Sequence, residues 1–344
     1  MMDKTCLSCL IATLLMFCAI SSVLAAEPVI AIQGGDLYTI TSGIIKNGTI
    51  LVKDGKIWQI GQGIEIPKDA KVIDAKGKVV MPGLVAALAE VGGFSGEKIA
   101  DSLDPFHYNV LLALASGVTT AFVVGGKPSG ENPIGGTNAV IKMTYGDLDS
   151  MLLKEPAAEN ASISSDQWLR KTNFIQNLRK AQTYLRKLAE YQRAKGKGEK
   201  VEEPKKPDGI DNYIRLLGRE MPVRLSAGSA NDIMSALEIV DEFGIRMVIE
   251  DAFEAWIVAD EIAKRGVSLI ITPRQKRSPN EDISGQSGSN VENAAILKKA
   301  GVRFTVVPPV RAFWFTTEGF AGRDLMALPM EAAFAVSGGL DEQT

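Results

Sequence analysis

Histidine and cysteine are almost absent from this sequence of 344 residues, which contains one histidine, His107, and three cysteines, Cys6, Cys9 and Cys18. These two residue types supply most zinc ligands and the usual Cys–His nucleophile pairs. Their scarcity excludes most zinc sites and thiol-based catalytic sites. Because all three cysteines lie in the first 18 residues, the remainder of the chain has neither disulfides nor thiolate metal ligands available to it.

The sequence also lacks an excess of either charge, with 38 basic and 41 acidic side chains and a net charge of -3. That balance argues against a protein that coats nucleic acid or an acidic membrane surface. Hydrophobic residues make up 46% and charged residues 23%, which is typical of a folded globular protein. A chain of this length is expected to form one large α/β domain with a small accessory unit, or two medium domains.

Residues 1–25 have the pattern of an export signal. Lys4 gives a basic start, residues 7–20 form an apolar run, and Val23-Leu24-Ala25 is a plausible peptidase site. The run is shorter than the about 20 apolar residues that a membrane span needs. We therefore expect a cleaved signal peptide, rather than an uncleaved anchor, and an exported protein that is periplasmic or secreted and has no other membrane attachment.

Residues 26–80 predict a small antiparallel β-sheet. Short β-rich runs are separated by turn sequences that include Asn47-Gly48 and Asp54-Gly55. Asn-Gly and Asp-Gly favour tight hairpin turns because these residues tolerate a positive φ. The expected strands are 30–32, 36–40, 49–52, 57–60 and 71–73.

From residue 81 onward, buried strands alternate with amphipathic helices, which is typical of a parallel sheet. Four helices end at a glycine that directly precedes a strand, at Gly117, Gly244, Gly266 and Gly301. This alternation favours a (β/α) barrel or an open doubly wound sheet. The expected strands are 84–88, 119–124, 139–143, 223–227, 246–250, 267–272 and 302–307, and the expected helices are 105–115, 230–243, 254–265, 290–300 and 325–336.

A helical and charged insertion, residues 145–215, interrupts this alternation. Apolar residues from Trp168 to Leu188 recur at helical spacing, and the helix continues into a charged linker at 195–207. The lysines of the linker are interleaved with acidic residues, and stacking aromatics are few. We therefore expect a solvated helix face and a surface loop, with no nucleic acid as partner.

Several segments together resemble the amidohydrolase superfamily, and most closely its exported imidazolonepropionase-like subgroup. The segments, in chain order, are GTILVKDGKI (48–57), VIDAKGKVVMPGLV (72–85), ALASGVTT (113–120), NPIGG (132–136) and LPMEAA (328–333). The resemblance implies a (β/α)8 TIM-like barrel, residues 81–344, with a small β-sandwich to which residues 26–80 contribute. It also implies Zn²⁺ or another divalent metal at the carboxyl ends of the barrel strands, where it activates water to hydrolyse C–N bonds.

The resemblance also implies where the metal ligands should lie, and this chain has lost them. In the family, Pro-Gly-Leu-Val is followed by an aspartate, here Ala86, and then by the first pair of histidine ligands. The six ligand positions of this sequence are Leu88, Glu90, Ser226, Gly228, Asp251 and Pro309. None holds the residue that the family uses, so we expect no bound metal and no catalytic residue. His107 starts a helix away from these positions and is expected to be a structural or surface residue.

Two of the replacements are carboxylates, Glu90 and Asp251, which leaves an alternative. Oxygen ligands suit Mg²⁺, Ca²⁺ or Mn²⁺ better than Zn²⁺, so these two acids form a candidate hard-cation site. The opposing interpretation, which we favour, is that they are solvated or paired with Arg224 or Arg246.

The chain stops at Thr344, where relatives continue into a further helix and the remaining sandwich strands. We expect a C-terminal truncation that leaves apolar surface and sheet edges uncovered. A homo-oligomer or a paired amidohydrolase subunit would cover them. The sequence thus predicts an amidohydrolase-like pseudoenzyme, acting as a non-catalytic subunit or ligand-binding homologue. The alternatives are a hydrolase of non-peptide or dipeptide C–N bonds with a remodelled carboxylate site, and a truncated gene product without a stable fold.

Overall fold

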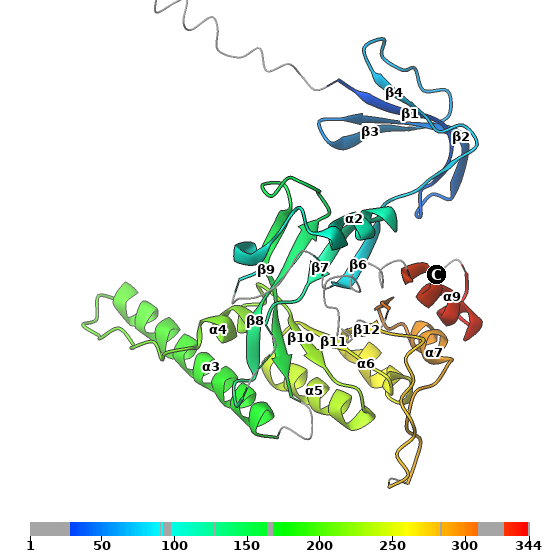
Figure 1. The fold of residues 1–344 in the computed structure, drawn as a ribbon. Coiled ribbons are helices and arrows are strands. Elements are labelled where there is room, and N and C mark those ends of the chain that lie inside the picture. Colours follow the sequence, from blue (N-terminus) through cyan, green and yellow to red (C-terminus); the bar gives the residue numbers. More distant parts are fainter. Residues whose placement is uncertain are drawn as a thin grey trace, which may run out of the picture. The chain divides into compact units, whose positions relative to one another are not determined.

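The computed structural model describes residues 28–89, 91, 98–126, 128, 130–163, 168–282, 284–308 and 327–342. The chain divides into two compact units, with the boundary between Pro82 and Gly83 (Figure 1). The sequence predicted the corresponding boundary at residues 80 and 81. The predicted signal peptide, Glu90 and Pro309 lie outside the described residues.

The N-terminal unit is a five-stranded sheet in which β1 is central. Strands β1 and β2 are antiparallel, as are β2 and β3, whereas β4 and β5 both run parallel to β1. The expectation of an antiparallel sheet is therefore wrong for β4 and β5. The strands are β1 (Ile30–Tyr38), β2 (Ile44–Lys53), β3 (Lys56–Gly61), β4 (Lys71–Asp74) and β5 (Val79–Val80).

The two predicted hairpin turns of this sheet have different outcomes. Asp54 and Gly55 have φ values of 51° and 69° and connect β2 to β3, so this turn is confirmed. Asn47 and Gly48 instead lie inside β2, opposite irregular register positions of β1. A Cβ at Gly48 would lie 2.5 Å from Leu37 Cδ1, so glycine is needed there for close packing rather than for a turn.

The C-terminal unit is built on an eight-stranded sheet that forms a nearly closed barrel, in the order β13-β12-β11-β10-β9-β8-β7-β6. Its strands are parallel except β8, which is antiparallel to both neighbours. Short connections join β7 to β8 and β8 to β9, whereas a parallel pair needs a long crossover. The strands are β6 (Leu84–Ala89), β7 (Val118–Val123), β8 (Ile134–Lys142), β9 (Leu152–Ser162), β10 (Val223–Ser226), β11 (Met247–Glu250), β12 (Ser268–Ile271) and β13 (Phe304–Val306).

Strand β9 lies within the segment 145–215 that the sequence predicts as an insertion. It pairs in parallel with β10, so it belongs to the barrel sheet. Its sequence, LLKEPAAENAS, has no run of β-branched residues, and its buried positions include the small residues Ala157, Ala158 and Ala161. Only the part of this segment after β9 is helical and charged, beginning with α3 (Trp168–Gly196).

The helices follow the predicted alternation. Helix α5 begins after Ser229, whose Oγ accepts a hydrogen bond from Asp232 N at 3.1 Å, and it ends at Gly244 with φ of 64°. These two caps confirm the range that the sequence predicts. Besides α3, the described helices of this unit are η1 (Ala100–Ser102), α2 (Tyr108–Ala115), α4 (Asp211–Leu217), α5 (Ala230–Phe243), η3 (Ala255–Ile257), α6 (Ala259–Arg265), α7 (Asn293–Lys299) and α9 (Leu328–Ser337).

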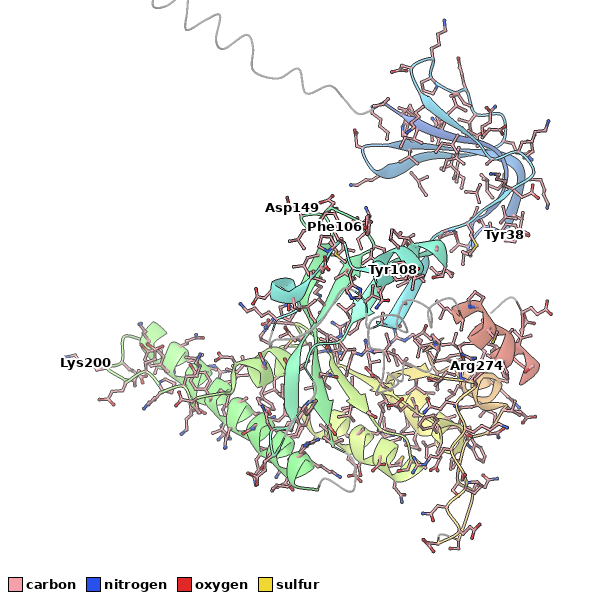
Figure 2. All side chains as sticks on the ribbon, viewed as in Figure 1. Tyr38, Phe106, Tyr108, Asp149, Lys200 and Arg274 are labelled. Carbon is pink, nitrogen blue, oxygen red and sulfur yellow. The ribbon has the colours of Figure 1, made fainter. Side chains whose placement is uncertain are left out.

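The core of the C-terminal unit lies between the sheet and its helices. Leu225 of β10 and Ile249 of β11 are fully buried, as are Leu237 of α5 and Leu297 of α7. Helix α9 is held by an ion pair between its buried Glu331 and Arg274, which follows β12 (Figure 2). Within the part of the chain that the structure describes, no helix has the length and apolar character needed to cross a membrane.

Candidate functional site

A cavity of about 510 Å³ lies at the carboxyl ends of the parallel strands. Enzymes with (β/α) barrels place their active sites at this end, because the loops that follow the strands meet there. The cavity is therefore the candidate functional site. Its lining residues from strand ends and the segments just after them are Leu88, Val124, Asn160, Ala161, Ser162, Ser226, Gly228, Glu250, Asp251, Phe253, Thr272, Gln275 and Pro308.

The structure brings together four of the six positions at which the sequence placed family ligands. Leu88, Ser226, Gly228 and Asp251 all line the cavity, although they come from three different strand ends. Ala86, two residues before Leu88, is fully buried within β6 and does not line it. The other two positions, Glu90 and Pro309, lie outside the described residues.

Asp251 and Ser226 form a hydrogen-bonded pair at this cavity. Ser226 Oγ donates to Asp251 Oδ2 at 2.8 Å. Asp251 follows β11 with a left-handed φ of 55°, and Phe253 N donates back to its carbonyl at 2.7 Å. Aspartate visits this backbone region more readily than most residues. This tight turn directs the Asp251 carboxylate toward Ser226 on the neighbouring strand.

A buried ion pair between Arg224 and Glu250 joins β10 to β11. Glu250 lines the cavity, whereas Arg224 is only 3% exposed and lies deeper in the barrel. Arg224 Nε donates to Glu250 Oε1, and Arg224 Nη1 donates to Ala87 O of β6 at 2.8 Å. The guanidinium also lies 4.0 Å from the ring centroid of Phe122 on β7.

Burial lowers the pKa of Arg224, and the attraction of Glu250 opposes that shift. The sequence proposed Arg224 as a partner for Glu90 or Asp251. The structure pairs it with Glu250 instead, because Glu250 is the last residue of β11 and reaches across to β10. The sequence did not predict this pair as part of the site, although an arginine between the apolar residues Val223 and Leu225 was an available signal.

Glu254 organises the loops beside the cavity. It is 4% exposed, and its two oxygens accept hydrogen bonds from Ala230 N at 2.9 Å and Gly288 N at 2.8 Å. Arg277 lies 3.9 Å from the same carboxylate. Space is tight here, because a Cβ at Gly228 would lie 2.8 Å from Arg277 Nη1. Glu254 thus has a structural role and is not available as a ligand.

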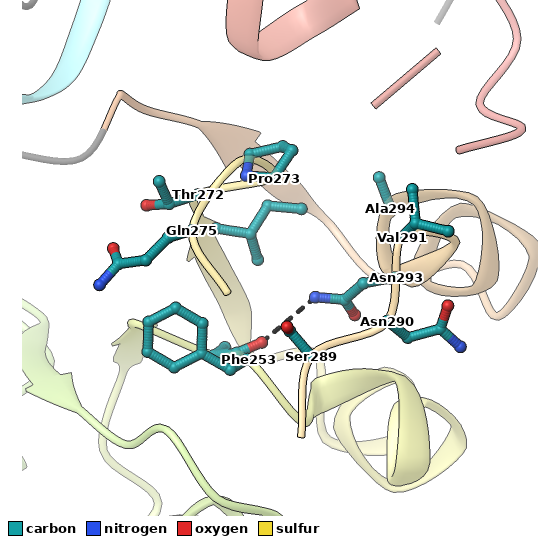
Figure 3. A pocket seen from close by; sticks show the side chains of 11 residues that line it. Phe253, Thr272, Pro273, Gln275, Ser289, Asn290, Val291, Asn293 and Ala294 are labelled. Carbon is teal, nitrogen blue, oxygen red and sulfur yellow. Dashed lines mark hydrogen bonds between the residues drawn. The ribbon is translucent and has the colours of Figure 1, made fainter. Parts of the chain in front are cut away.

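A second, smaller hollow of about 20 Å³ adjoins the cavity (Figure 3). Phe253, Thr272 and Gln275 line both spaces. Figure 3 shows these three side chains directed to the same side, away from Asn293, whose Nδ2 donates to Ala252 O at 3.3 Å. The hollow has room for about one water molecule and none for a substrate.

The described residues do not fit the transition-metal site of the family. Such a site needs several histidine or carboxylate ligands that converge on one point. Glu250 is paired with Arg224 and Asp251 with Ser226, and the described part of the chain contains no group of three His, Cys, Asp or Glu residues placed to hold a metal ion. His107 caps helix α2, where its Nδ1 accepts from Asn109 N at 3.3 Å, and it does not line the cavity.

Comparison with known proteins shows what the fold is similar to. The crystal structure of an amidohydrolase from Thermotoga maritima matches with a TM-score of 0.71 and 23% identity, over 91% of this chain and 85% of that one. No family model matches the chain. The 5'-deoxyadenosine deaminase of Methanosarcina acetivorans is 56% identical over 43 residues, which is 12% of this chain and 10% of the deaminase.

The imidazolonepropionase of Staphylococcus aureus is 35% identical over 77 residues, which is 22% of this chain and 19% of that enzyme. The chain thus matches less than a fifth of the length of either curated relative. These relatives and the structural neighbour are amidohydrolase-superfamily proteins, and the resemblance predicted from the sequence is confirmed. The structural match establishes the fold.

Proposed function

We propose that this chain, which has the fold of the amidohydrolase superfamily, binds a small molecule at the mouth of its barrel without metal-dependent catalysis. The cavity lies where the relatives' fold places its active site. One observation carries the proposal: the described ligand positions hold Leu88, Ser226, Gly228 and Asp251, and the only one of these that is a carboxylate is hydrogen-bonded to Ser226. The similar proteins are named as an amidohydrolase, a deaminase and an imidazolonepropionase, so a hydrolase is the alternative.

The ion pair of Arg224 and Glu250 beneath the cavity supports a binding role without a metal. The guanidinium of Arg224 lies in the barrel interior, where a metal site of the family would be surrounded by neutral or negative ligands. Its pairing with Glu250 satisfies one of the acids that face the cavity. A divalent cation that took Glu250 as a ligand would first have to break this buried ion pair, which raises the free energy of metal binding.

The test is an activity assay on the purified protein. The chain is loaded in turn with Zn²⁺, Mn²⁺ and Mg²⁺ and assayed against dipeptides, lactams and aminopurine nucleosides, with a catalytically active amidohydrolase as the control. We expect no turnover above buffer with any metal. Metal-dependent hydrolysis that copurifies with the folded protein would overturn the proposal.

The second candidate function is hydrolysis of C–N bonds by a remodelled carboxylate site. The observation that favours it is the position of Asp251 in the cavity; its expected partner Glu90 lies outside the described residues. In this case Glu90→Ala and Asp251→Ala would each abolish a metal-dependent activity. Turnover that is unchanged in both variants would eliminate this candidate.

Export and assembly belong to the same proposal. We propose that residues 1–25 direct the chain to the periplasm or the medium, and that it works as a homo-oligomer or beside a paired amidohydrolase subunit. Fractionation of cells that express the tagged chain tests the first part. Light scattering of the purified protein, alone and with such a subunit, tests the second.

A further inference from the structure

The Asp251 carboxylate differs from that of Glu250, which also lines the cavity, because the partner of Asp251 is a neutral hydroxyl and the partner of Glu250 is a guanidinium. Ser226 Oγ donates to one of the Asp251 oxygens at 2.8 Å. Among the described residues, no lysine or arginine forms an ion pair with Asp251. The negative charge of Asp251 is therefore not neutralised by the part of the protein that the structure describes.

The neighbouring charges are already engaged. Glu250 is paired with Arg224, and Arg277 lies 3.9 Å from Glu254. Arg170, at the cavity wall, donates its Nε–H to Gly130 O at 2.8 Å. Each of these groups thus has its own acceptor or counter-charge. Asp251 is the acid at the cavity that has no counter-ion among the described residues, so it is available to a cationic ligand.

The walls around Asp251 combine apolar surface with neutral polar groups. Leu88, Val124 and Phe253 supply apolar surface, and Asn160 and Gln275 supply amide groups. Phe253 lines the same cavity as Asp251, so an aromatic side chain is available there for a cation. A cavity of about 510 Å³ lies within the range of small-molecule sites in proteins.

From this arrangement we infer that the cavity binds a small organic amine as its ammonium ion, with Asp251 as the counter-ion. The inference rests on the proposed function, because it names the ligand class of the same non-catalytic cavity. The ammonium group donates hydrogen bonds to Asp251, whose orientation Ser226 and the left-handed turn maintain. The hydrocarbon part of the ligand contacts Leu88, Val124 and Phe253.

The experiment compares three probes of the same shape by isothermal titration into the full chain: 2-phenylethylamine, 2-phenylethanol and 3-phenylpropionate. We expect the amine to bind at least about tenfold more tightly than the alcohol, and the carboxylate more weakly than both. Asp251→Asn should abolish the preference for the amine while the affinity for the alcohol is retained. Asparagine also tolerates a left-handed φ, so this variant is expected to fold.

Two further variants keep the test specific. Ser226→Ala should weaken amine binding less than Asp251→Asn does, since it removes the hydrogen bond and leaves the charge. Asp149→Asn changes an exposed acid that does not line the cavity and should leave all three affinities unchanged (Figure 2).

The outcomes separate this inference from the proposed function. Equal affinities for amine and alcohol, or an amine preference that survives in Asp251→Asn, would overturn the inference and leave a non-catalytic binding protein. Absence of binding by every probe would also overturn the inference. Metal-dependent turnover in the activity assay would instead overturn the proposed function, whatever the probes do.

Discussion

Glu159 of β9 is a titratable residue in an unusual environment. It is fully buried, and neither of its carboxylate oxygens has a hydrogen-bond partner among the described residues. Burial raises the pKa of Glu159 to about 8, and attraction by Arg215 opposes the shift only in part. Tyr213, whose pKa is raised to about 12 chiefly by its own burial, lies close enough to sense the charge of Glu159. Near neutral pH this carboxyl group is therefore mostly protonated in the folded protein.

This raised pKa predicts that the protein loses stability as the pH rises. Below about pH 4.5 the group is protonated in both the folded and the unfolded chain, and above about pH 8 it is ionised in both. Between these values only the folded state holds the proton, so Glu159 destabilises folding by up to about 1.4 kcal/mol per pH unit. Urea unfolding at pH 5, 6, 7 and 8 should show this slope. Glu159→Gln should remove most of the slope and be the more stable protein at pH 8; an unchanged slope would contradict the assignment.

The ion pair of Arg224 and Glu250 gives a second prediction at the residue scale. Arg224→Met leaves Glu250 without its partner, so it should lower the free energy of unfolding by about 3–5 kcal/mol. Glu250→Gln added to Arg224→Met should recover much of that loss, because the unpaired charge is gone. The exposed pair of Arg179 and Glu242 is the control, and Arg179→Met should cost about 1 kcal/mol or less. Equal costs for the two arginines would show that Arg224 is not effectively buried.

The sequence located several site positions but not their interactions. Leu88, Ser226, Gly228 and Asp251 were identified by resemblance, and the structure places all four at one cavity. The partners of Arg224 and Asp251 could not be predicted, because they depend on which strand ends lie side by side. Register between parallel strands, such as Ser226 opposite Glu250, is set by packing of the whole sheet.

At the scale of elements, local sequence signals predicted helices better than strands. The caps of α5, Ser229 and Gly244, are visible in the sequence and set its ends. The direction of β8 and the membership of β9 in the sheet depend on connections and on contacts distant in sequence, which periodicity does not report. The seven predicted barrel strands are present, with β8 running opposite to the expected direction.

We predict that helix α3 packs against the rest of the C-terminal unit through its first half. Phe174, Leu178 and Ala181 are fully buried, whereas the end that leads to Lys200 projects into solvent (Figure 2). Leu178→Ala should therefore lower the free energy of unfolding by about 2–5 kcal/mol. Leu185→Ala, at a position that is only partly buried, should cost clearly less. Similar losses in both variants, measured by urea unfolding, would contradict this division of the helix.

At the scale of the whole molecule, the protein combines a barrel with the fold of an amidohydrolase and a cavity whose described residues do not fit a metal site. The truncation expected from the sequence beyond Thr344 stays a prediction, as do export and the partner subunit. The third sequence-based alternative, a product without a stable fold, is tested by the thermal melt of the whole chain.

The barrel fold and the cavity that does not fit a metal site together predict the result of a thermal melt of the whole chain. We expect a cooperative transition, because the C-terminal unit has an extensive buried core. The midpoint should be the same with and without EDTA, since the proposed function involves no bound metal. A midpoint that falls on chelation, measured by calorimetry, would show a structural metal.

The most direct test of the account is a calorimetric titration of Zn²⁺ into the chelator-treated full chain. The account predicts no stoichiometric binding, because Leu88, Ser226 and Gly228 replace ligands, Glu250 is held in an ion pair with Arg224, and Asp251 alone cannot hold the ion. Tight one-to-one binding of Zn²⁺ that is lost in Asp251→Asn would contradict this account and would favour a metal-dependent hydrolase.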